Sequence, residues 1–287
     1  MPEITDVAID FDGVIRAGNL HNFCNTICFS QEEWKPLVSV YKKGSQVGLS
    51  ADECKVQHET VQGEMQKNFE TLWEELKRID QNQDGRFLNP TGSKEEWKNI
   101  FTTLIDQGFR VSIPSFTAYG PLISFYLRDV IGLSDDYLQK MKINAWMPAD
   151  PNSDNKNNHI DQILGCKPEE RAEVYQRVIL IDDGRKNVAG MDQVFQNTEH
   201  TIQLESDSEQ NPKVVKEQLE KRLGIQFNPA EKKQESVIEA APSVEELSMQ
   251  PKTEQPQGAV KEGLFIIMLV YPPPKAVAWA VGYACYK

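Results

Sequence analysis

The chain has 287 residues and a formal net charge of −12 at pH 7. That length is enough for one or two buried cores. The acidic balance argues against a nucleic-acid partner, because binding to the phosphate backbone requires lysine and arginine side chains. Five cysteines without a disulfide-framework spacing favour a reducing compartment, and no classical secretory signal is recognisable, so we expect synthesis in a cytosol.

The first predicted strand is an apolar run from Val7 to Ile9 that ends in two carboxylates, Asp10 and Asp12, followed by Gly13. This pattern indicates a buried strand that opens into a tight turn. Two carboxylates at a strand end repel each other unless a cation or a hydrogen-bond network stabilises them. A divalent metal is one solution, and a simple solvated turn at Asp12-Gly13 is the other.

Residues 16–107 are predicted to be a mostly helical insertion. Apolar residues recur there at helical spacing, and a further helix begins at Ser93 with a capping-box partner, Glu96, and stops at Gly108. The apolar stripe consists of Phe69, Leu72, Trp73, Leu76 and Ile79.

The insertion contains two weak metal-binding patterns. Residues 80–85 resemble the first half of a calcium-binding EF-hand loop, but Thr91 stands where a bidentate glutamate is needed, so we predict a polar turn. Two pairs of potential zinc ligands are each spaced four residues apart, with buried free thiols as the alternative. These residues are Cys24, Cys28, Cys54 and His58.

Strands and helices alternate over residues 5–205, which predicts an α/β fold with a parallel sheet and a site at the carboxyl ends of its strands. Further strands are expected at 109–115, which ends in Ser115, at 143–146 and at 178–182, which ends in Asp182-Asp183. Helices are expected at 121–131, 158–164 and 212–224.

The C-terminal part differs in composition from the rest of the chain. Residues 226–262 are rich in Glu, Gln, Pro, Ser and Lys and predict a disordered acidic tail. Residues 263–287 are apolar but interrupted by Pro272-Pro273-Pro274, and neither half is long enough to span a bilayer as a helix. An interfacial membrane anchor, a partner-binding segment and an incorrectly read terminus all remain open for this stretch.

Four motifs in this order resemble the haloacid-dehalogenase (HAD) superfamily of phosphohydrolases. They are Asp10-Phe11-Asp12-Gly13-Val14, the strand end at Ser115, Lys156 leading a helix with Lys142 and Lys140 as competitors, and the strand end at Asp182-Asp183. The resemblance covers about two-thirds of the chain and implies a Rossmann-like parallel sheet flanked by helices. It implies a catalytic core from residues 1–15 and 108–225, with 16–107 as a cap-like helical insertion between the first two motifs.

The resemblance also implies roles for the motif residues. Asp10 would be the nucleophile that forms an aspartyl-phosphate, and Asp12 the general acid and base. Mg²⁺ would be held by Asp10, the Asp12 backbone carbonyl and Asp182, with Asp183 beside them. Ser115 would bind a phosphoryl oxygen, and Lys156 would neutralise charge. In this family, a second acid such as Asp12 favours phosphate-ester chemistry over carbon–halogen cleavage.

We therefore predict a magnesium-dependent phosphatase acting on a phosphorylated small molecule or a phosphoprotein, such as a phosphotyrosine peptide. The glutamate-rich tail resembles translocation signals of some bacterial secreted effectors, which extends the prediction to a host-directed protein phosphatase. Two other classes stay open. The Asp-x-Asp pair is also typical of metal-dependent glycosyltransferases, and a HAD-fold interaction protein could retain these motifs without catalysing a reaction.

Overall fold

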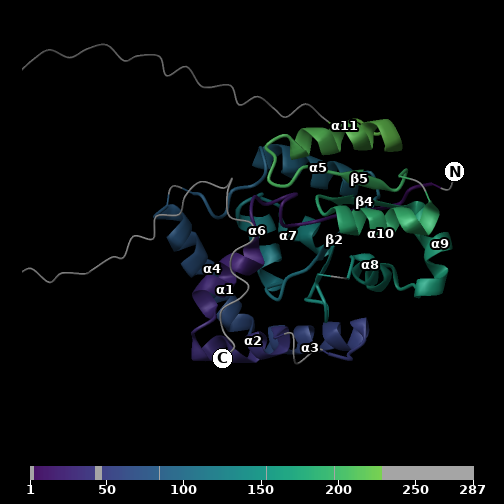
Figure 1. Cartoon of the computed structure of the whole chain (residues 1–287). Helices are drawn as coiled ribbons and strands as arrows, with labels where there is room; N and C mark the ends of the chain where they lie inside the picture. The colour runs from purple at the N-terminus through teal and green to yellow at the C-terminus, as the bar shows by residue number, and fades with distance from the viewer. Residues whose placement is uncertain (1–2, 43–46, 84, 153, 197, 228–287) are drawn as a thin grey trace, which may run out of the picture. The chain divides into compact units, whose positions relative to one another are not determined.

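A five-stranded parallel sheet forms the centre of the computed structural model, which describes residues 3–42, 47–83, 85–152, 154–196 and 198–227 (Figure 1). The strands are β1 (Asp6–Ile9), β2 (Arg110–Ser115), β3 (Lys142–Ala145), β4 (Val178–Asp182) and β5 (Thr201–Gln203). Their order across the sheet is β3-β2-β1-β4-β5. The predicted α/β fold with a parallel sheet flanked by helices is confirmed, whereas nearly all of the predicted tail and all of 263–287 lie outside the described residues.

Alternate side chains along the central strands face two different helical layers, as the two-residue period of a strand requires. Ala8 of β1 and Leu180 of β4 pack with residues of three helical elements on one face. These elements are α8 (Asn157–Leu164), α10 (Arg185–Phe195) and the short turn η4 (Tyr175–Arg177). Ile9 and Ile181 belong to the larger core on the opposite face. Because both faces are covered, β1 and β4 are buried along their whole length.

The remaining helices of this region complete the two layers. They are α5 (Lys94–Asp106), α6 (Pro121–Asp129), α7 (Asp135–Gln139), α9 (Arg171–Val174), preceded by the turn η3 (Pro168–Glu170), and α11 (Asn211–Leu223). Helix α5 packs against β2 and α11. It therefore packs beside the sheet, although it lies within the residues 16–107 that were predicted as the insertion. The reason is topological: α5 is the helix that returns the chain from the insertion to the parallel strand β2.

The sheet changes winding direction between β1 and β4. Strand β1 pairs with β2 on one side, and on the other side with β4, which is reached only after β3. In open α/β sheets, such a switch point leaves a crevice at the carboxyl ends of the two central strands. Asp10 follows β1, and Asp182 ends β4, so both acidic strand ends lie at this crevice.

The insertion between β1 and α5 is helical, as predicted. Its elements are α1 (Leu20–Cys28), η1 (Glu32–Trp34), α2 (Lys35–Tyr41), α3 (Ala51–Glu64) and α4 (Gln66–Gln81). Phe69 of the predicted apolar stripe packs with Trp34 and with Tyr119 of the core region. Trp73 donates its indole N–H to Asp129 at the end of α6 (2.6 Å). The insertion thus shares one continuous hydrophobic core with the larger-core face of the sheet.

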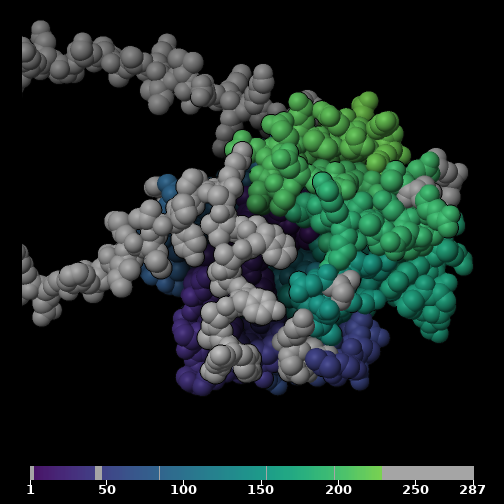
Figure 2. All heavy atoms as spheres, in the orientation of Figure 1, coloured from purple at the N-terminus to yellow at the C-terminus, as the bar shows by residue number. Residues whose placement is uncertain are grey.

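Polar contacts also fix α3 and α1 to the core. The buried Gln62 side chain donates to the Ala118 carbonyl (2.9 Å), and the Ala118 N–H donates to His21 Nδ1 (3.2 Å). At the other end of α3, Gln162 donates to Asp52 (2.9 Å). The two buried hydrogen bonds to Ala118 would be lost if the insertion swung away, so they oppose such a movement. In the space-filling view the insertion, in purple and blue, and α11, in green, lie at opposite ends of the face shown (Figure 2).

The weak metal patterns of the insertion do not come together. Within the described ranges, one group of three or more side chains could hold a metal, and it consists of aspartates. Cys24, Cys28 and Cys54 are buried free thiols. Asp80 accepts hydrogen bonds from the Phe87 and Leu88 N–H groups, as in a polar turn. Among the helices placed by the structure, none has the length and apolar character that a bilayer span requires.

Candidate active site

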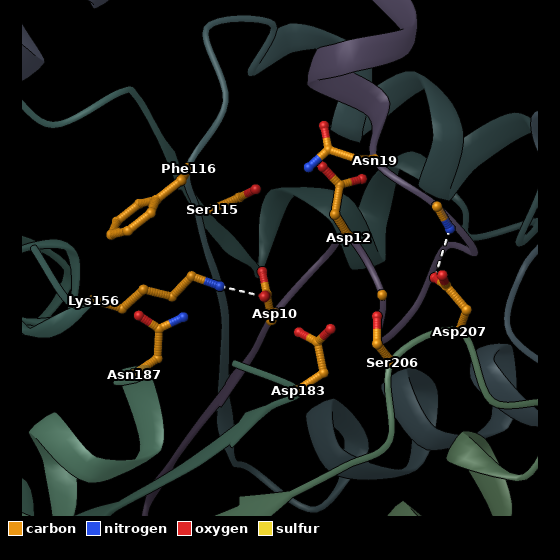
Figure 3. Close-up of a pocket in the computed structure, with 12 residues that line it drawn as sticks. Asp10, Asp12, Asn19, Ser115, Phe116, Lys156, Asp183, Asn187, Ser206 and Asp207 are labelled. Carbon is orange, nitrogen blue, oxygen red and sulfur yellow. Dashed lines mark hydrogen bonds and ion pairs between the residues drawn. The ribbon is translucent and has the colours of Figure 1, made fainter. Parts of the chain in front are cut away.

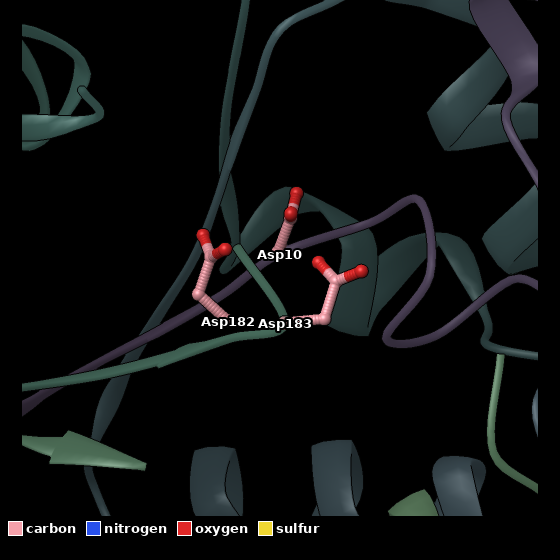
Figure 4. A group of neighbouring side chains, drawn as sticks. All are labelled: Asp10, Asp182 and Asp183. Atoms are coloured by element: carbon pink, nitrogen blue, oxygen red, sulfur yellow. The ribbon is translucent and has the colours of Figure 1, made fainter. Parts of the chain in front are cut away.

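Three carboxylates converge at the switch point. Asp10 is the first residue after β1, Asp182 is the last residue of β4, and Asp183 follows it. Each offers an oxygen within 4.8 Å of the others, and Asp10 and Asp182 are buried (Figure 4). The apolar β1 and β4 sequences pair in register up to Ile9 and Ile181, which brings the two acidic strand ends side by side.

Lys156 lies between two of these carboxylates. Its buried ammonium contacts Asp10 Oδ2 (Figure 3). It also donates to Asp182 Oδ2 at 2.9 Å. It occupies the N-cap position of α8, which packs against β2 and β3. The structure thus directs Lys156 to the site.

The two competing lysines point elsewhere. Lys142 donates to the Ile163 carbonyl (2.8 Å), and the Lys140 ammonium lies over the Tyr137 ring. Lys156 is therefore the lysine whose position fits the third motif, although its role in a reaction stays a prediction.

Hydrogen bonds fix the directions of the carboxylates. Asp182 Oδ1 accepts from the Gly184 N–H (2.7 Å) and from Asn187 Nδ2 (3.0 Å). Asp10 Oδ1 accepts from the Phe11 N–H (2.6 Å). Both aspartates are consequently held with their second oxygen toward Lys156.

The carboxylates around Lys156 outnumber its single ammonium group. Burial, together with the neighbouring Asp182 and Asp183, raises the pKa of Asp10 well above its usual range despite the ammonium of Lys156. Burial alone would lower the pKa of Lys156, but Asp10 and Asp182 outweigh it and raise that pKa. One ammonium among three carboxylates leaves a net negative charge in a buried place. An all-oxygen set with this charge fits a hard divalent cation such as Mg²⁺.

Asp12 lies apart from the three-aspartate group. Its Oδ1 accepts from the Leu20 N–H at the start of α1 (2.9 Å) and lies 3.5 Å from Arg16 Nη1. Burial raises its pKa to about 6, although Arg16 opposes the shift. A carboxyl group that changes protonation state near neutral pH suits acid–base chemistry. Its side chain is not in the group that could hold a metal, and the role of its backbone carbonyl as a ligand stays a prediction.

The candidate site residues lie around a pocket of about 300 Å³ (Figure 3). It is lined by Asp10, Asp12, Gly13, Gly18, Asn19, Ser115, Phe116, Lys156, Asp183, Asn187, Ser206 and Asp207. Ser115, at the end of β2, is buried and faces the same pocket as Asp10 and Lys156. Of the residues to which the four motifs assign a role, all except Asp182 line this pocket, and Asp182 is hydrogen-bonded to the lining residue Lys156.

Several lining residues were not expected from the sequence. Asn187 lies in the first turn of α10, and its Oδ1 is buried and has no hydrogen-bond partner among the described residues. A polar residue in the first turn after Asp182-Asp183 was the available signal for it. Ser206 and Asp207 follow the three-residue strand β5, and no pattern in the sequence links them to Asp10.

Gly13 is required by the packing around the site. Its φ is +78°, and an added Cβ would lie 2.3 Å from Asp183 Oδ2 and 2.8 Å from Ser206 Oγ. Glycine therefore allows the turn after Asp12 to pass directly against a candidate metal ligand.

We expect Gly13→Ala to lower the free energy of unfolding by about 2–4 kcal/mol, through left-handed strain plus displacement of Asp183. Gly108→Ala is the matched control, since Gly108 also has a positive φ (+86°) but open space around its Cβ position. The control should lose only about 1 kcal/mol. Denaturant unfolding of both variants checks this, and equal losses would show that the contact with Asp183 is unimportant.

Only two of the lining residues, Gly18 and Asn19, lie in the insertion, at its first turn. Within the part of the chain that the structure describes, helices α2, α3 and α4 contribute no residue to the pocket wall. The described helices of the insertion therefore lie outside the lining of this pocket.

Comparisons with known proteins add little to this geometry. No protein-family model and no curated protein matches the sequence. A solved structure described as a predicted HAD-like family hydrolase from Porphyromonas gingivalis matches 74% of this chain and 96% of its own, with 15% identity and a TM-score of 0.37. A likeness at that level assigns neither an activity nor a substrate to this chain.

Proposed function

We propose that the chain is a magnesium-dependent phosphohydrolase of the HAD type, which hydrolyses phosphate monoesters through an aspartyl-phosphate on Asp10. The observation that carries the proposal is the convergence of Asp10, Asp182 and Asp183 around Lys156 at the switch point of a parallel sheet. The order of the four motifs in the sequence gives independent support.

The first step is attack by an Asp10 oxygen on phosphorus, while the ester P–O bond breaks. Asp10 is oriented for this by the Phe11 N–H on one oxygen and by Lys156 on the other. Ser115 lines the pocket, where its hydroxyl can donate to a phosphoryl oxygen. A Mg²⁺ ion held by Asp10, Asp182 and Asp183 would neutralise charge that develops on the phosphoryl group.

Asp12 carries the protons. It gives a proton to the leaving oxygen in the first step and takes one from the water that attacks the aspartyl-phosphate in the second. Inorganic phosphate then leaves, and the Asp10 carboxylate is restored. The separation of Asp12 from the metal-binding group, and its bond to the Leu20 N–H, support this division of roles.

The position of the insertion supports a proposal for the substrate class. Because α2, α3 and α4 lie outside the pocket wall described above, a phosphorylated side chain on a protein or peptide could enter as readily as a small molecule. Phosphotyrosine peptides are therefore part of the proposal. Delivery into a host cell stays a prediction from the tail, nearly all of which lies outside the described residues.

The test is hydrolysis of p-nitrophenyl phosphate and of phosphopeptides with and without Mg²⁺. We expect activity that chelation abolishes, and Asp182→Asn should raise the half-saturating Mg²⁺ concentration about tenfold or more. Asp136→Asn, at an exposed site in the first turn of α7, is the control and should behave as the wild type. Metal-independent hydrolysis would contradict the proposal. Binding of nucleotide sugars in titration calorimetry would instead favour a glycosyltransferase. If the protein neither hydrolyses phosphate esters nor binds nucleotide sugars, an interaction protein is favoured.

A further inference from the structure

The turn from Gly13 to Gly18 carries the chain from Asp12 into the insertion. Both glycines have positive φ values, +78° and +77°. Two residues beyond Gly18, the Leu20 N–H donates to Asp12 Oδ1 (2.9 Å). The path of this turn therefore decides where the donor to Asp12 lies, and with it the direction of the Asp12 carboxylate.

Asp207, in the loop after β5, holds both ends of this turn. Its Oδ1 accepts from the Gly18 N–H at 2.6 Å, a bond that Figure 3 marks, and its own N–H donates to the Gly13 carbonyl at 2.9 Å. Asn211 adds a second donor to the same Gly13 carbonyl (3.0 Å). One loop residue thus bridges the beginning and the end of the turn that carries Asp12.

The conformation of Asp207 is unusual. Its φ is +60°, in the left-handed region that non-glycine residues rarely adopt, and in the described part of the chain only Gln196 shares this feature. Strain of this kind persists where surrounding contacts hold it in place, and it concentrates at functional sites. The neighbouring residue, Ser206, and the candidate metal ligand Asp183 both lie against Gly13 at the start of this turn. Two adjacent residues of the loop after β5 therefore lie against the turn that carries Asp12.

We propose that Asp207 is a positioning residue for the acid–base step of the phosphatase reaction, an inference that rests on the proposed function. It fixes the Gly13–Gly18 turn, and through it the Leu20 N–H, so that Asp12 stays directed into the pocket. Asp207 acts on the reaction through Asp12, without needing to touch the phosphoryl group.

Three variants separate the hydrogen bond from backbone strain. Asp207→Gly removes the acceptor but tolerates the positive φ. Asp207→Asn keeps an oxygen in place and also tolerates that conformation. Gln196→Gly is the matched control, because Gln196 has a φ of +57° at the C-cap of α10 and does not line the pocket.

The readout is the dependence of kcat on the leaving group. An alkyl phosphate such as glycerol phosphate needs its leaving oxygen protonated, whereas p-nitrophenolate departs with little help. We expect Asp207→Gly to lower kcat about tenfold more for glycerol phosphate than for p-nitrophenyl phosphate, with KM little changed. Asp207→Asn should restore the wild-type ratio, and Gln196→Gly should keep it. An equal loss on both substrates would indicate a merely structural role and overturn the inference.

Amide hydrogen exchange tests the bridge without relying on activity. Peptides covering residues 13–20 should exchange faster in Asp207→Gly than in the wild type, Asp207→Asn or Gln196→Gly. If the wild type hydrolyses no phosphate ester, the proposed function fails, and the exchange rates still decide whether Asp207 holds the turn. Unchanged exchange in Asp207→Gly would overturn the inference even in an active phosphatase.

Discussion

Replacing Asp10 by Asn should reduce magnesium-dependent phosphate-ester hydrolysis by about a thousandfold or more, because the change removes the nucleophile itself. The amide has nearly the same shape as the carboxylate and can still accept from the Phe11 N–H, so the fold should persist. Steady-state kinetics with p-nitrophenyl phosphate, together with circular dichroism of the variant, measures both parts of the expectation.

Asp136→Asn again provides the matched control, since it makes the same chemical change on the surface. A contaminating phosphatase would leave equal activity in both variants and in the wild type. If purified Asp10→Asn retains full activity while the fold is intact, Asp10 is not the nucleophile and the proposed mechanism is wrong.

Replacing Lys156 by Met should have the second large effect, this time on stability as well as activity. The ammonium is the charge that neutralises Asp10 and Asp182, and removing one partner of a buried ion pair leaves uncompensated charge. We expect the free energy of unfolding in EDTA to fall by about 3 kcal/mol at pH 8. Mg²⁺ should restore part of this loss, because a cation bound by the same carboxylates replaces the missing charge.

The loss should depend on pH in a defined direction. Burial raises the pKa of Asp10 in the folded state, so the folded protein favours the protonated acid more than the unfolded chain does. The contribution of Asp10 to the free energy of unfolding is therefore present at low pH and is lost as the pH rises through the folded-state pKa of Asp10. Without Lys156 the pKa of Asp10 in the folded protein rises further. In EDTA the variant should therefore approach wild-type stability as the pH falls toward 5. Thermal unfolding of both proteins at a series of pH values measures this difference.

Lys142→Met controls for the loss of a lysine at the alternative motif position. Lys142 donates to a backbone carbonyl from the edge strand β3, so its loss should cost about 1 kcal/mol at most and leave activity unchanged. Equal effects of the two substitutions would show that Lys156 has no special place in the charge balance.

The central part of the site could be anticipated from the sequence because it depends on local patterns. Apolar runs that end in acidic residues mark β1 and β4, and parallel strands bring their carboxyl ends to one edge of the sheet. The choice of Lys156 over Lys142 could not be derived in this way. It depends on how the polar loop before α8 folds, and that loop has no periodic pattern.

Other features depend on contacts between distant segments. Strand β5 has only three residues, too few for an alternating pattern to stand out, and its loop delivers Asp207 to Gly18. The position of α5 with the sheet likewise depends on its packing against β2 and α11, because its own sequence indicates only an amphipathic helix.

The aspartyl-phosphate on Asp10 is tested most directly by trapping it as a covalent intermediate. The wild type is incubated with substrate and Mg²⁺, quenched in acid, digested and analysed by mass spectrometry. We expect one phosphoryl group on the peptide that contains Asp10, sensitive to hydroxylamine and absent from Asp10→Asn. Rapid turnover with every peptide unmodified, or a phosphoryl group on another residue, would contradict the account.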